Sequence, residues 1–201
     1  MNTRTAILAT SLSLVLLLLP PQGLWHNVSE KHFLGSIREV APQTAVPASI
    51  ASYENLLRQY AEGIDWDWRL LAAIVYHESR FNNDAQSSKG ATGLMQIHST
   101  RYSADTLLIP AVNLSIGTAY LKKLERMFDA AGPMDSLQFA LAAFNLGDGK
   151  MRRLISRADS AGLDARRWEE VATMLPQGHH TVAYVDKVLN TFDEYSRKYP
   201  R

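Results

Sequence analysis

The sequence has no cysteine among its 201 residues, and this absence excludes several kinds of chemistry. Disulfide bonds, thiol catalysis, cysteine-ligated zinc and a lipid-modified N-terminal cysteine are all ruled out. A surplus of charge is also lacking, since 21 basic and 20 acidic residues leave a formal net charge of +1. The chain therefore lacks the basic field typical of nucleic-acid-binding proteins, and we expect no nucleic-acid partner.

Long hydrophobic runs are absent except near the N-terminus. Arg4 precedes an uncharged run over residues 6–19, which Pro20 and Pro21 end. This run is shorter than the ~20 apolar residues that a spanning helix prefers, and the pattern is typical of a secretory signal. No small-x-small cleavage site follows it, so an uncleaved anchor is the alternative. We expect export across the inner membrane, with the protein either periplasmic or anchored by residues 6–19.

The rest of the chain divides into a linker and one domain. Residues 1–22 form the predicted signal peptide or anchor, residues 23–51 a linker that contains Pro42 and Pro47, and residues 52–201 a single domain. Hydrophobic residues make up 46% of the chain, which is typical of a globular protein. No internal repeat is present.

The domain shows helical periodicity and no sustained strand-like alternation. Ser52 and Asp65 are the predicted N-caps of the first two helices, and Gly147 is predicted to end the fourth. The fold class is therefore predicted to be all-α, with helices at 52–62, 66–80, 113–130, 134–146, 150–159, 165–174 and 181–195.

One carboxylate lies on the apolar face of the second predicted helix. Glu78 continues the spacing of Leu71, Ile74 and Phe81. Burial disfavours an ionised carboxyl and raises its pKa, which would keep a proton available near neutral pH. On the helix alone, a solvent-facing Glu78, or one paired with Arg80, is the simpler interpretation.

The loop after this helix has the composition of a ligand pocket. In the stretch 87–97 (SSKGATGLMQI), Gly90 and Gly93 allow tight turns, and one amide, Gln96, stands among large apolar residues. An amide in such surroundings can orient a polar ligand. A glycine-rich turn docked on the core explains the same spacing, and Met95 is expected to be a core residue.

Together these segments resemble the soluble-type (SLT) lytic transglycosylases, which have a goose-type lysozyme fold. Four motifs stand in order across about residues 55–195. They are ESRF at 78–81 with Ser87 after it, GATGLMQI at 90–97, AAFNLG at 142–147, and TVAYVDKV at 181–188. The resemblance implies a lysozyme-like helical domain.

The resemblance also implies a reaction. Peptidoglycan glycan strands would be cut at the β-1,4 bond between N-acetylmuramic acid and N-acetylglucosamine. Glu78 would act as the single acid and base, and attack by the muramic acid's own 6-hydroxyl would leave a 1,6-anhydro product. No cofactor and no metal are implied.

Four further residues receive roles from the same resemblance. Ser87 and Gln96 would line the sugar groove, Asn145 would lie near the cleaved bond, and the hydroxyl of Tyr184 would orient Glu78. From its helical position alone, Tyr184 could equally be an aromatic residue of the core.

The sequence departs from the family pattern at three positions. Phe144 replaces the usual Tyr, Asn83 stands where Pro is frequent, and His98 stands where an apolar residue is common. The missing hydroxyl at Phe144 would leave more of the orienting task to Tyr184.

Several other signals favour structural interpretations. The pair His77-Glu78 lacks the second histidine that a zinc-protease motif needs, because position 81 is Phe. Adjacent His179 and His180 are expected to face solvent. The basic stretch at 152–167 has no interleaved aromatic residues, so it is expected to be a solvated helix face.

Two alternatives to a lytic transglycosylase stay open on the sequence. The first is a goose-type muramidase that hydrolyses the same bond with water. The second is a non-catalytic domain that binds wall glycan, for which Phe144 is a first hint. The reducing end of the product, free or anhydro, separates the enzymes.

Overall fold

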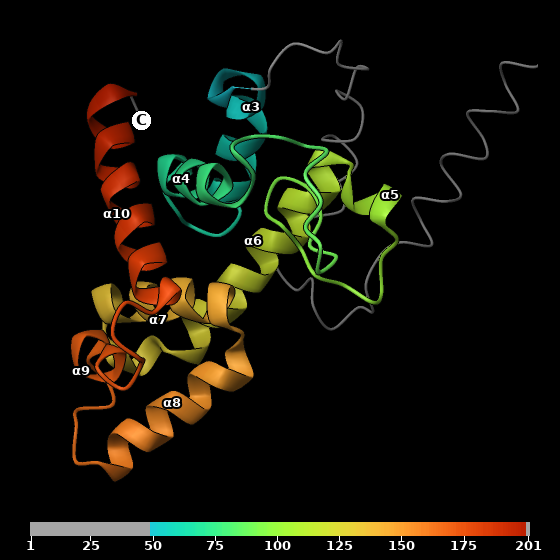
Figure 1. Ribbon diagram of the computed structural model, residues 1–201. Helices are drawn as coiled ribbons and strands as arrows, with labels where there is room; N and C mark the ends of the chain where they lie inside the picture. Colours follow the sequence, from blue (N-terminus) through green and yellow to red (C-terminus); the bar gives the residue numbers. More distant parts are fainter. Residues whose placement is uncertain (1–48, 200–201) are drawn as a thin grey trace, which may run out of the picture. The chain divides into compact units, whose positions relative to one another are not determined.

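The computed structural model describes residues 49–199, and this part of the chain is helical (Figure 1). Its elements are α3 (Ile50–Glu62), α4 (Trp68–Ser79), α5 (Ala104–Leu107), α6 (Pro110–Met127), the 3-10 helix η2 (Asp129–Ala131), α7 (Pro133–Leu146), α8 (Asp148–Ser160), α9 (Trp168–Ala172) and α10 (His180–Lys198). Over this range the β-structure consists of isolated bridges at Thr92. The all-α prediction is confirmed.

The predicted leader lies outside the described residues, as does nearly all of the predicted linker. Among the helices at 49–199, none combines the length and the apolar character needed to cross a membrane.

The predicted N-caps of the first two helices are wrong. Helix α3 begins after Ser49 rather than after Ser52. Helix α4 is capped by Asp67, whose carboxylate accepts a hydrogen bond from the Arg69 amide, while Asp65 lies in the preceding turn at φ 58°. Several residues near each helix start can serve as caps, so composition alone does not select one. Helices α5 and η2 were not predicted, because such short elements show no periodicity.

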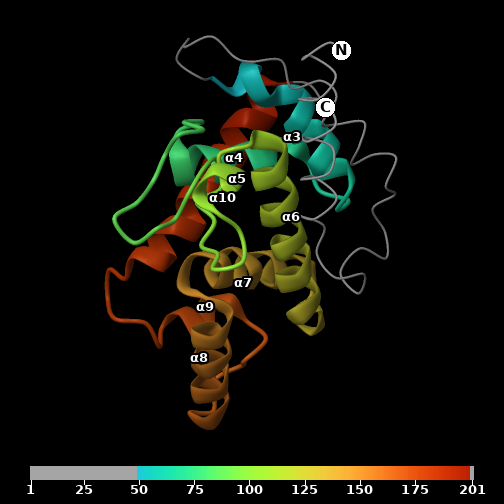
Figure 2. The ribbon, with the colours of Figure 1, turned by 90° about the vertical axis from the view of Figure 1, so that its right-hand side faces the viewer.

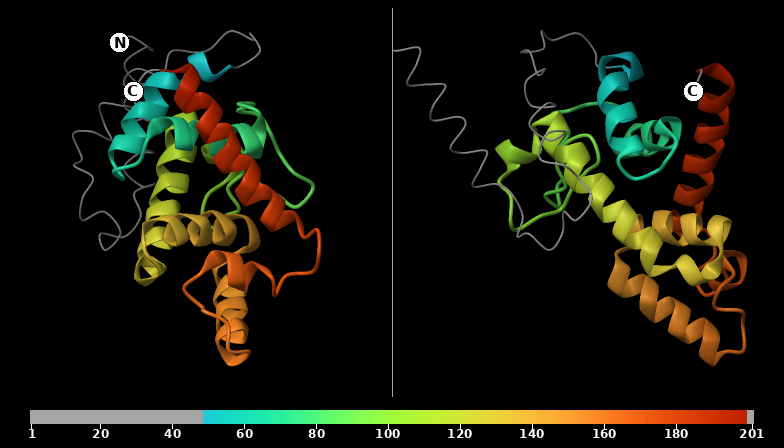
Figure 3. Two further views of the ribbon diagram at one scale, coloured as in Figure 1. Left: turned by 90° about the vertical axis from the view of Figure 1, so that its left-hand side faces the viewer. Right: turned by 180° about the vertical axis from the view of Figure 1, so that it is seen from behind.

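Helix α4 forms the centre of the core. Residues 70–75 are all buried, with exposures of 5% or less. A helix that is apolar on every side must be covered on every side, and α4 packs against α3 and α10 (Figures 1 and 3). Burial of each large aliphatic side chain here contributes about 1.5–3 kcal/mol. This packing therefore fixes the position of α4 in the domain.

Helices α7, α8 and α9 form a second group. Helix α7 packs against α6 and α10, and α8 and α9 pack on α7 (Figure 2). Gly147, at φ 95°, ends α7 as predicted and turns the chain into α8. This left-handed conformation favours glycine. The turn leaves the end of α7 beside the start of α10.

A candidate active site at the end of helix α4

Glu78 lies in the last turn of α4, next to the apolar core. Leu71 and Ile74, on the same face, have no exposed surface, and Glu78 itself is partly buried. Burial raises the pKa of the Glu78 carboxyl from 4.5 to about 7, and an interaction with the Tyr184 hydroxyl lowers it in partial compensation. The raised pKa agrees with the helical spacing. A carboxyl in this range can both give and accept a proton near neutrality.

Tyr184 comes from α10 and directs its hydroxyl toward Glu78. Burial and the negative charge of Glu78 raise the pKa of the Tyr184 phenol well above 10, so this group stays protonated. The hydroxyl oxygen is buried, and within residues 49–199 it makes no hydrogen bond of full geometry. The interaction with Glu78 is therefore loose. Such contacts in unliganded enzymes often tighten when substrate binds.

The chain turns sharply immediately after Glu78. Helix α4 ends at Ser79, and Arg80 and Phe81 both adopt left-handed conformations, at φ 55° and 60°. Phe81 is buried as expected, but it follows a turn and does not continue the helical face. The guanidinium of Arg80 lies 3.9 Å from the Tyr76 ring centroid, on the aromatic face, instead of pairing with Glu78. A cation that would lower the pKa of Glu78 is thus kept aside.

Ser87 and Gln96 make their hydrogen bonds within the loop that contains them. The exposed Ser87 accepts hydrogen bonds through Oγ from the amides of Ala91 (2.9 Å) and Lys89 (3.3 Å). Gln96 donates from Nε2 to the carbonyls of Ala85 and Gly93, both at 3.0 Å. These contacts shape the loop, and the structure brings neither side chain into a hydrogen bond with Glu78.

Asn113 on α6 anchors this loop and was not predicted as a site residue. The side chain has no exposed surface. Its Oδ1 accepts from the Met95 amide at 2.8 Å, and its Nδ2 donates to the carbonyls of Thr92 (2.9 Å) and Leu107 (2.8 Å). The sequence does carry a signal, since Asn113 shares a helix face with apolar residues. A buried amide there must find partners.

Two close contacts also fix the loop. A Cβ at Gly93 would collide with the side chain of Asn113 and the carbonyl of Leu107, and a Cβ at Gly117 would collide with Met95. Met95 is fully buried, as expected of a core residue. Glycine is therefore required at position 93, where φ is also positive, whereas a larger residue at position 117 would displace the Met95 side chain.

Asn145 connects the third motif to the fourth. Its Oδ1 accepts a hydrogen bond from the Thr181 hydroxyl at 2.8 Å. Thr181 is fully buried and lies one helical turn before Tyr184 on α10. The end of α7 therefore holds the part of α10 that carries Tyr184.

The structure places the three residues that depart from the family pattern, Phe144, Asn83 and His98, away from any contact with Glu78. Phe144 packs against Tyr120 with ring centroids 5.9 Å apart. Asn83 donates from Nδ2 to the Leu108 carbonyl at 2.6 Å, and His98 is exposed. None of these contacts involves Glu78.

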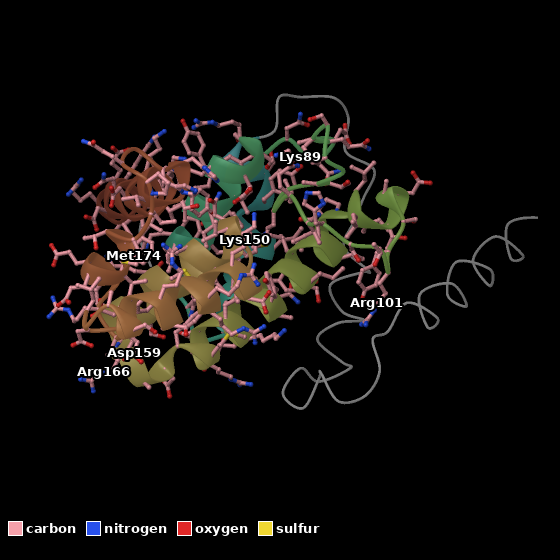
Figure 4. The ribbon with its side chains drawn as sticks, turned by 60° about the horizontal axis from the view of Figure 1, so that its bottom comes forward. Lys89, Arg101, Lys150, Asp159, Arg166 and Met174 are labelled. Atoms are coloured by element: carbon pink, nitrogen blue, oxygen red, sulfur yellow. The ribbon has the colours of Figure 1, made fainter. Side chains whose placement is uncertain are left out.

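The other polar signals are structural as well. The rings of His179 and His180 stack with centroids 4.3 Å apart, and His179 caps α10 by accepting from the Thr181 amide. Over residues 49–199, no group of three or more His, Asp or Glu side chains could hold a metal ion. The basic side chains of α8 and of the turn after it are exposed, including the labelled Lys150 and Arg166 (Figure 4).

A groove of about 910 Å³ lies elsewhere on the domain. Its walls come from α7, α9, the 173–179 segment and α10, with Met134, Trp168 and Val182 among the lining residues. The lining includes neither Glu78 nor Tyr184, so we assign the groove no part in the chemistry.

Comparison with known protein families gives one match that covers more than half of the chain. The family described as the transglycosylase SLT domain matches residues 55–165. This segment includes the first three motifs and ends before Tyr184.

Curated relatives carry related names. The membrane-bound lytic murein transglycosylase F of Desulfosudis oleivorans is 32% identical over 168 residues, 73% of this chain and 37% of the relative. The protein of the same name from Shewanella pealeana is 31% identical, over 74% of this chain and 35% of the relative. The chain thus spans about a third of the length of these relatives.

Solved structures share the fold. The lytic transglycosylase Slt of Pseudomonas aeruginosa, solved as an inactive mutant, superposes with a TM-score of 0.59 at 28% identity. The 70 kDa soluble lytic transglycosylase of Escherichia coli gives 0.58 at 30% identity. Each match covers 73% of this chain and 24% of the other. The prediction of a lysozyme-like all-α domain is confirmed.

Proposed function

Because the chain belongs to the transglycosylase SLT family, we propose that it is a peptidoglycan lytic transglycosylase. It cleaves the β-1,4 bond between N-acetylmuramic acid and N-acetylglucosamine. The observation that carries the proposal is the partly buried Glu78 carboxyl, with its pKa raised to about 7. Residues 52–201 form the catalytic domain, and residues 23–51 connect it to the leader.

In the first step Glu78 acts as an acid. The carboxyl gives its proton to the glycosidic oxygen as the bond to C1 of N-acetylmuramic acid breaks, so the N-acetylglucosamine leaves with a free 4-hydroxyl. A pKa near the working pH serves this transfer, because a large fraction of the enzyme holds the proton while the acid is still strong enough to give it up.

In the second step the same group acts as a base. The Glu78 carboxylate accepts the proton of the muramic acid 6-hydroxyl as that oxygen forms its bond to C1, which closes the 1,6-anhydro ring and restores the acid. The sugar's N-acetyl group supports the positive charge in between, so no carboxylate nucleophile is required. Asp84, the next acidic residue along the chain, is exposed and belongs to a turn with Asn82.

The remaining site residues position the sugar and the acid. Tyr184 orients Glu78, Asn145 lies near the cleaved bond, and Ser87 and Gln96 shape the 87–97 loop, which lines the sugar-binding site. Glycan strands of peptidoglycan are the partner, and neither cofactor nor metal takes part.

Product analysis tests this function. Purified sacculi treated with the enzyme should release muropeptides with 1,6-anhydro ends, which are lighter by one water than products of hydrolysis. Free reducing ends would instead identify a muramidase. Binding to sacculi without any release would identify a glycan-binding domain.

Enzyme activity is expected to fall as pH rises through about 7. The first step needs Glu78 protonated, and the pKa of this group is about 7. Above that value kcat/KM should decrease about tenfold per pH unit. Rates on soluble glycan strands between pH 5 and 9 measure this alkaline limb of the pH–rate profile. A constant rate from pH 6 to 9 would contradict the assignment of Glu78 as the acid.

Replacing Tyr184 by Phe is expected to lower kcat about tenfold, by loosening a catalytic group. The alkaline limb should move to higher pH, because the Tyr184 hydroxyl lowers the pKa of Glu78. Stability should change by less than about 1 kcal/mol, since the hydroxyl makes no full hydrogen bond. Tyr195→Phe on the same helix is the matched control. An unchanged rate and limb would make Tyr184 a packing residue only.

We further propose that the protein acts in the cell envelope. The N-terminal pattern favours export, and the first relatives are named as membrane-bound. The full-length protein should fractionate with periplasm or inner membrane, and deletion of residues 1–22 should leave it in the cytoplasm. Recovery of the full-length protein from the cytoplasm would contradict export.

A further inference from the structure

A histidine next to Glu78 joins the two helices that carry the proposed acid and its orienting tyrosine. His77 lies on α4, and its Nε2 is 2.8 Å from the Thr191 hydroxyl on α10. The backbone of Lys187, one turn earlier on α10, also interacts favourably with the protonated imidazole and raises its pKa. Thr191 is 8% exposed, so this contact is made inside the interface between the helices.

The His77–Thr191 contact and Tyr184 lie on the same face of α10. Tyr184 and Thr191 are seven residues apart, which is two helical turns and about 10 Å along one face of α10. Val188, between them on that face, is fully buried. On α4 the two partners, His77 and Glu78, are consecutive. A sliding or rotation of α10 on α4 would therefore move the Tyr184 hydroxyl relative to Glu78.

Burial and two neighbouring cations disfavour the protonated form of the His77 ring. Burial lowers the pKa of the imidazole, and the positive charges of Arg80 and Lys187 lower it further, while the interaction with the Lys187 backbone raises it. Tyr76 packs edge-on against the ring with centroids 5.2 Å apart. A neutral imidazole with fixed partners makes a directional contact, as a positioning group must.

We propose that His77 is a positioning residue: its hydrogen bond to Thr191 sets the placement of α10 on α4 and thereby holds the Tyr184 hydroxyl against Glu78. This inference rests on the proposed function, in which Tyr184 orients the acid. The same helix pair is joined a second time at its far end. There the buried Arg69 donates to the carbonyls of Ser196 (3.3 Å) and Tyr199 (3.0 Å).

The two sets of hydrogen bonds between α4 and α10 can be removed separately, so that one serves as the control for the other. Thr191→Val keeps the side-chain shape and removes the hydroxyl, and His77→Leu removes the ring nitrogens. His77→Gln restores an amide of similar reach. Arg69→Met loosens the same helix pair away from Glu78 and serves as the control for general destabilisation. Each variant is measured for kcat and KM on soluble glycan strands, for melting temperature, and for the Glu78 pKa by carboxyl carbon NMR.

His77→Leu and Thr191→Val should each lower kcat about tenfold, because displacements near 1 Å can cost as much as 10²-fold. KM should stay within about twofold. The Glu78 pKa should rise, since the Tyr184 hydroxyl lowers it in the parent. His77→Gln should recover most of the rate. In a Tyr184→Phe background, neither change should raise the Glu78 pKa further.

Two results would overturn the proposal. One is an unchanged Glu78 pKa and kcat in both His77→Leu and Thr191→Val. The other is an equal shift in Arg69→Met, which would reduce His77 to general packing. The NMR titration of Glu78 does not depend on catalytic turnover. If the parent protein released no product from sacculi, the proposed function would be refuted, but the titration would still decide whether His77 positions Tyr184.

Discussion

Glu78→Gln is expected to abolish the release of anhydromuropeptides from sacculi while the domain stays folded and still binds glycan. Glutamine keeps the shape of the side chain and removes the exchangeable proton. Loss of a general acid costs about 10²–10⁴-fold, and we expect the upper end because Glu78 serves as both acid and base. Product release is measured by chromatography of digested sacculi, and binding by co-sedimentation. Release near the parent rate would refute the assignment of Glu78.

The same substitution is expected to change the pH dependence of stability. The pKa of Glu78 is raised from 4.5 to about 7 on folding, so proton binding favours the folded state. This contribution is complete below pH 4.5 and is lost as pH rises through about 7. The ionised carboxylate then costs up to about 3 kcal/mol, and less to the extent that water still reaches it.

Glu78→Gln should therefore melt at a higher temperature than the parent protein at pH 8, with the difference shrinking toward pH 5. Glu62, exposed at the end of α3, is the matched control for loss of one carboxylate. A difference independent of pH would contradict the raised pKa. Unfolding of the Gln variant would make Glu78 a structural residue.

Asn113→Ala is expected to lower the free energy of unfolding by about 3–5 kcal/mol. The substitution leaves the Met95 amide and the carbonyls of Thr92 and Leu107 without their partner in a fully buried site. Each buried unsatisfied group costs about 1–3 kcal/mol, and the smaller side chain adds a cavity. Urea denaturation measures the loss.

Activity should fall with stability in this variant, because the 92–97 loop loses its anchor to α6. Hydrogen exchange at the Met95 amide, a donor to Asn113 in the parent, should accelerate. Asn190, exposed on α10, is the control, and Asn190→Ala should change stability by less than about 0.5 kcal/mol. A loss under about 1 kcal/mol for Asn113→Ala would show that the loop is held by its other contacts.

Local patterns in the sequence predicted the features that depend on neighbours in the chain. The helical spacing put Glu78 on the apolar face with Leu71 and Ile74, and the family motifs then favoured a partly buried acid over a solvent-facing one. Burial raises the pKa of Glu78 to about 7. Gly147 ends α7 because the chain needs a left-handed residue there. The motif order indicated the family, and the matching residues 55–165 confirm it.

Local sequence patterns did not predict the exact helix ends, because several neighbouring residues could each begin or end a helix. Ser52 and Asp65 were plausible caps, but the helices begin after Ser49 and Asp67, where tertiary packing places the turns. The periodicity that included Phe81 was broken by two left-handed residues, a conformation that spacing does not reveal.

The sequence by itself therefore determined the helical class and the family, since these follow from residue types and from their spacing and order along the chain, and it placed Glu78 on an apolar helix face. The tertiary structure decided which distant groups meet. His77 and Thr191, 114 residues apart, face each other across α4 and α10, and Asn113 reaches back 18 residues to hold Met95. When the hydrogen-bond partner of a side chain lies on a distant segment, the residues around that side chain do not reveal it, because only the packing of the helices brings the two together. The placement of Tyr184 against Glu78 is decided in the same way, by how α10 lies on α4.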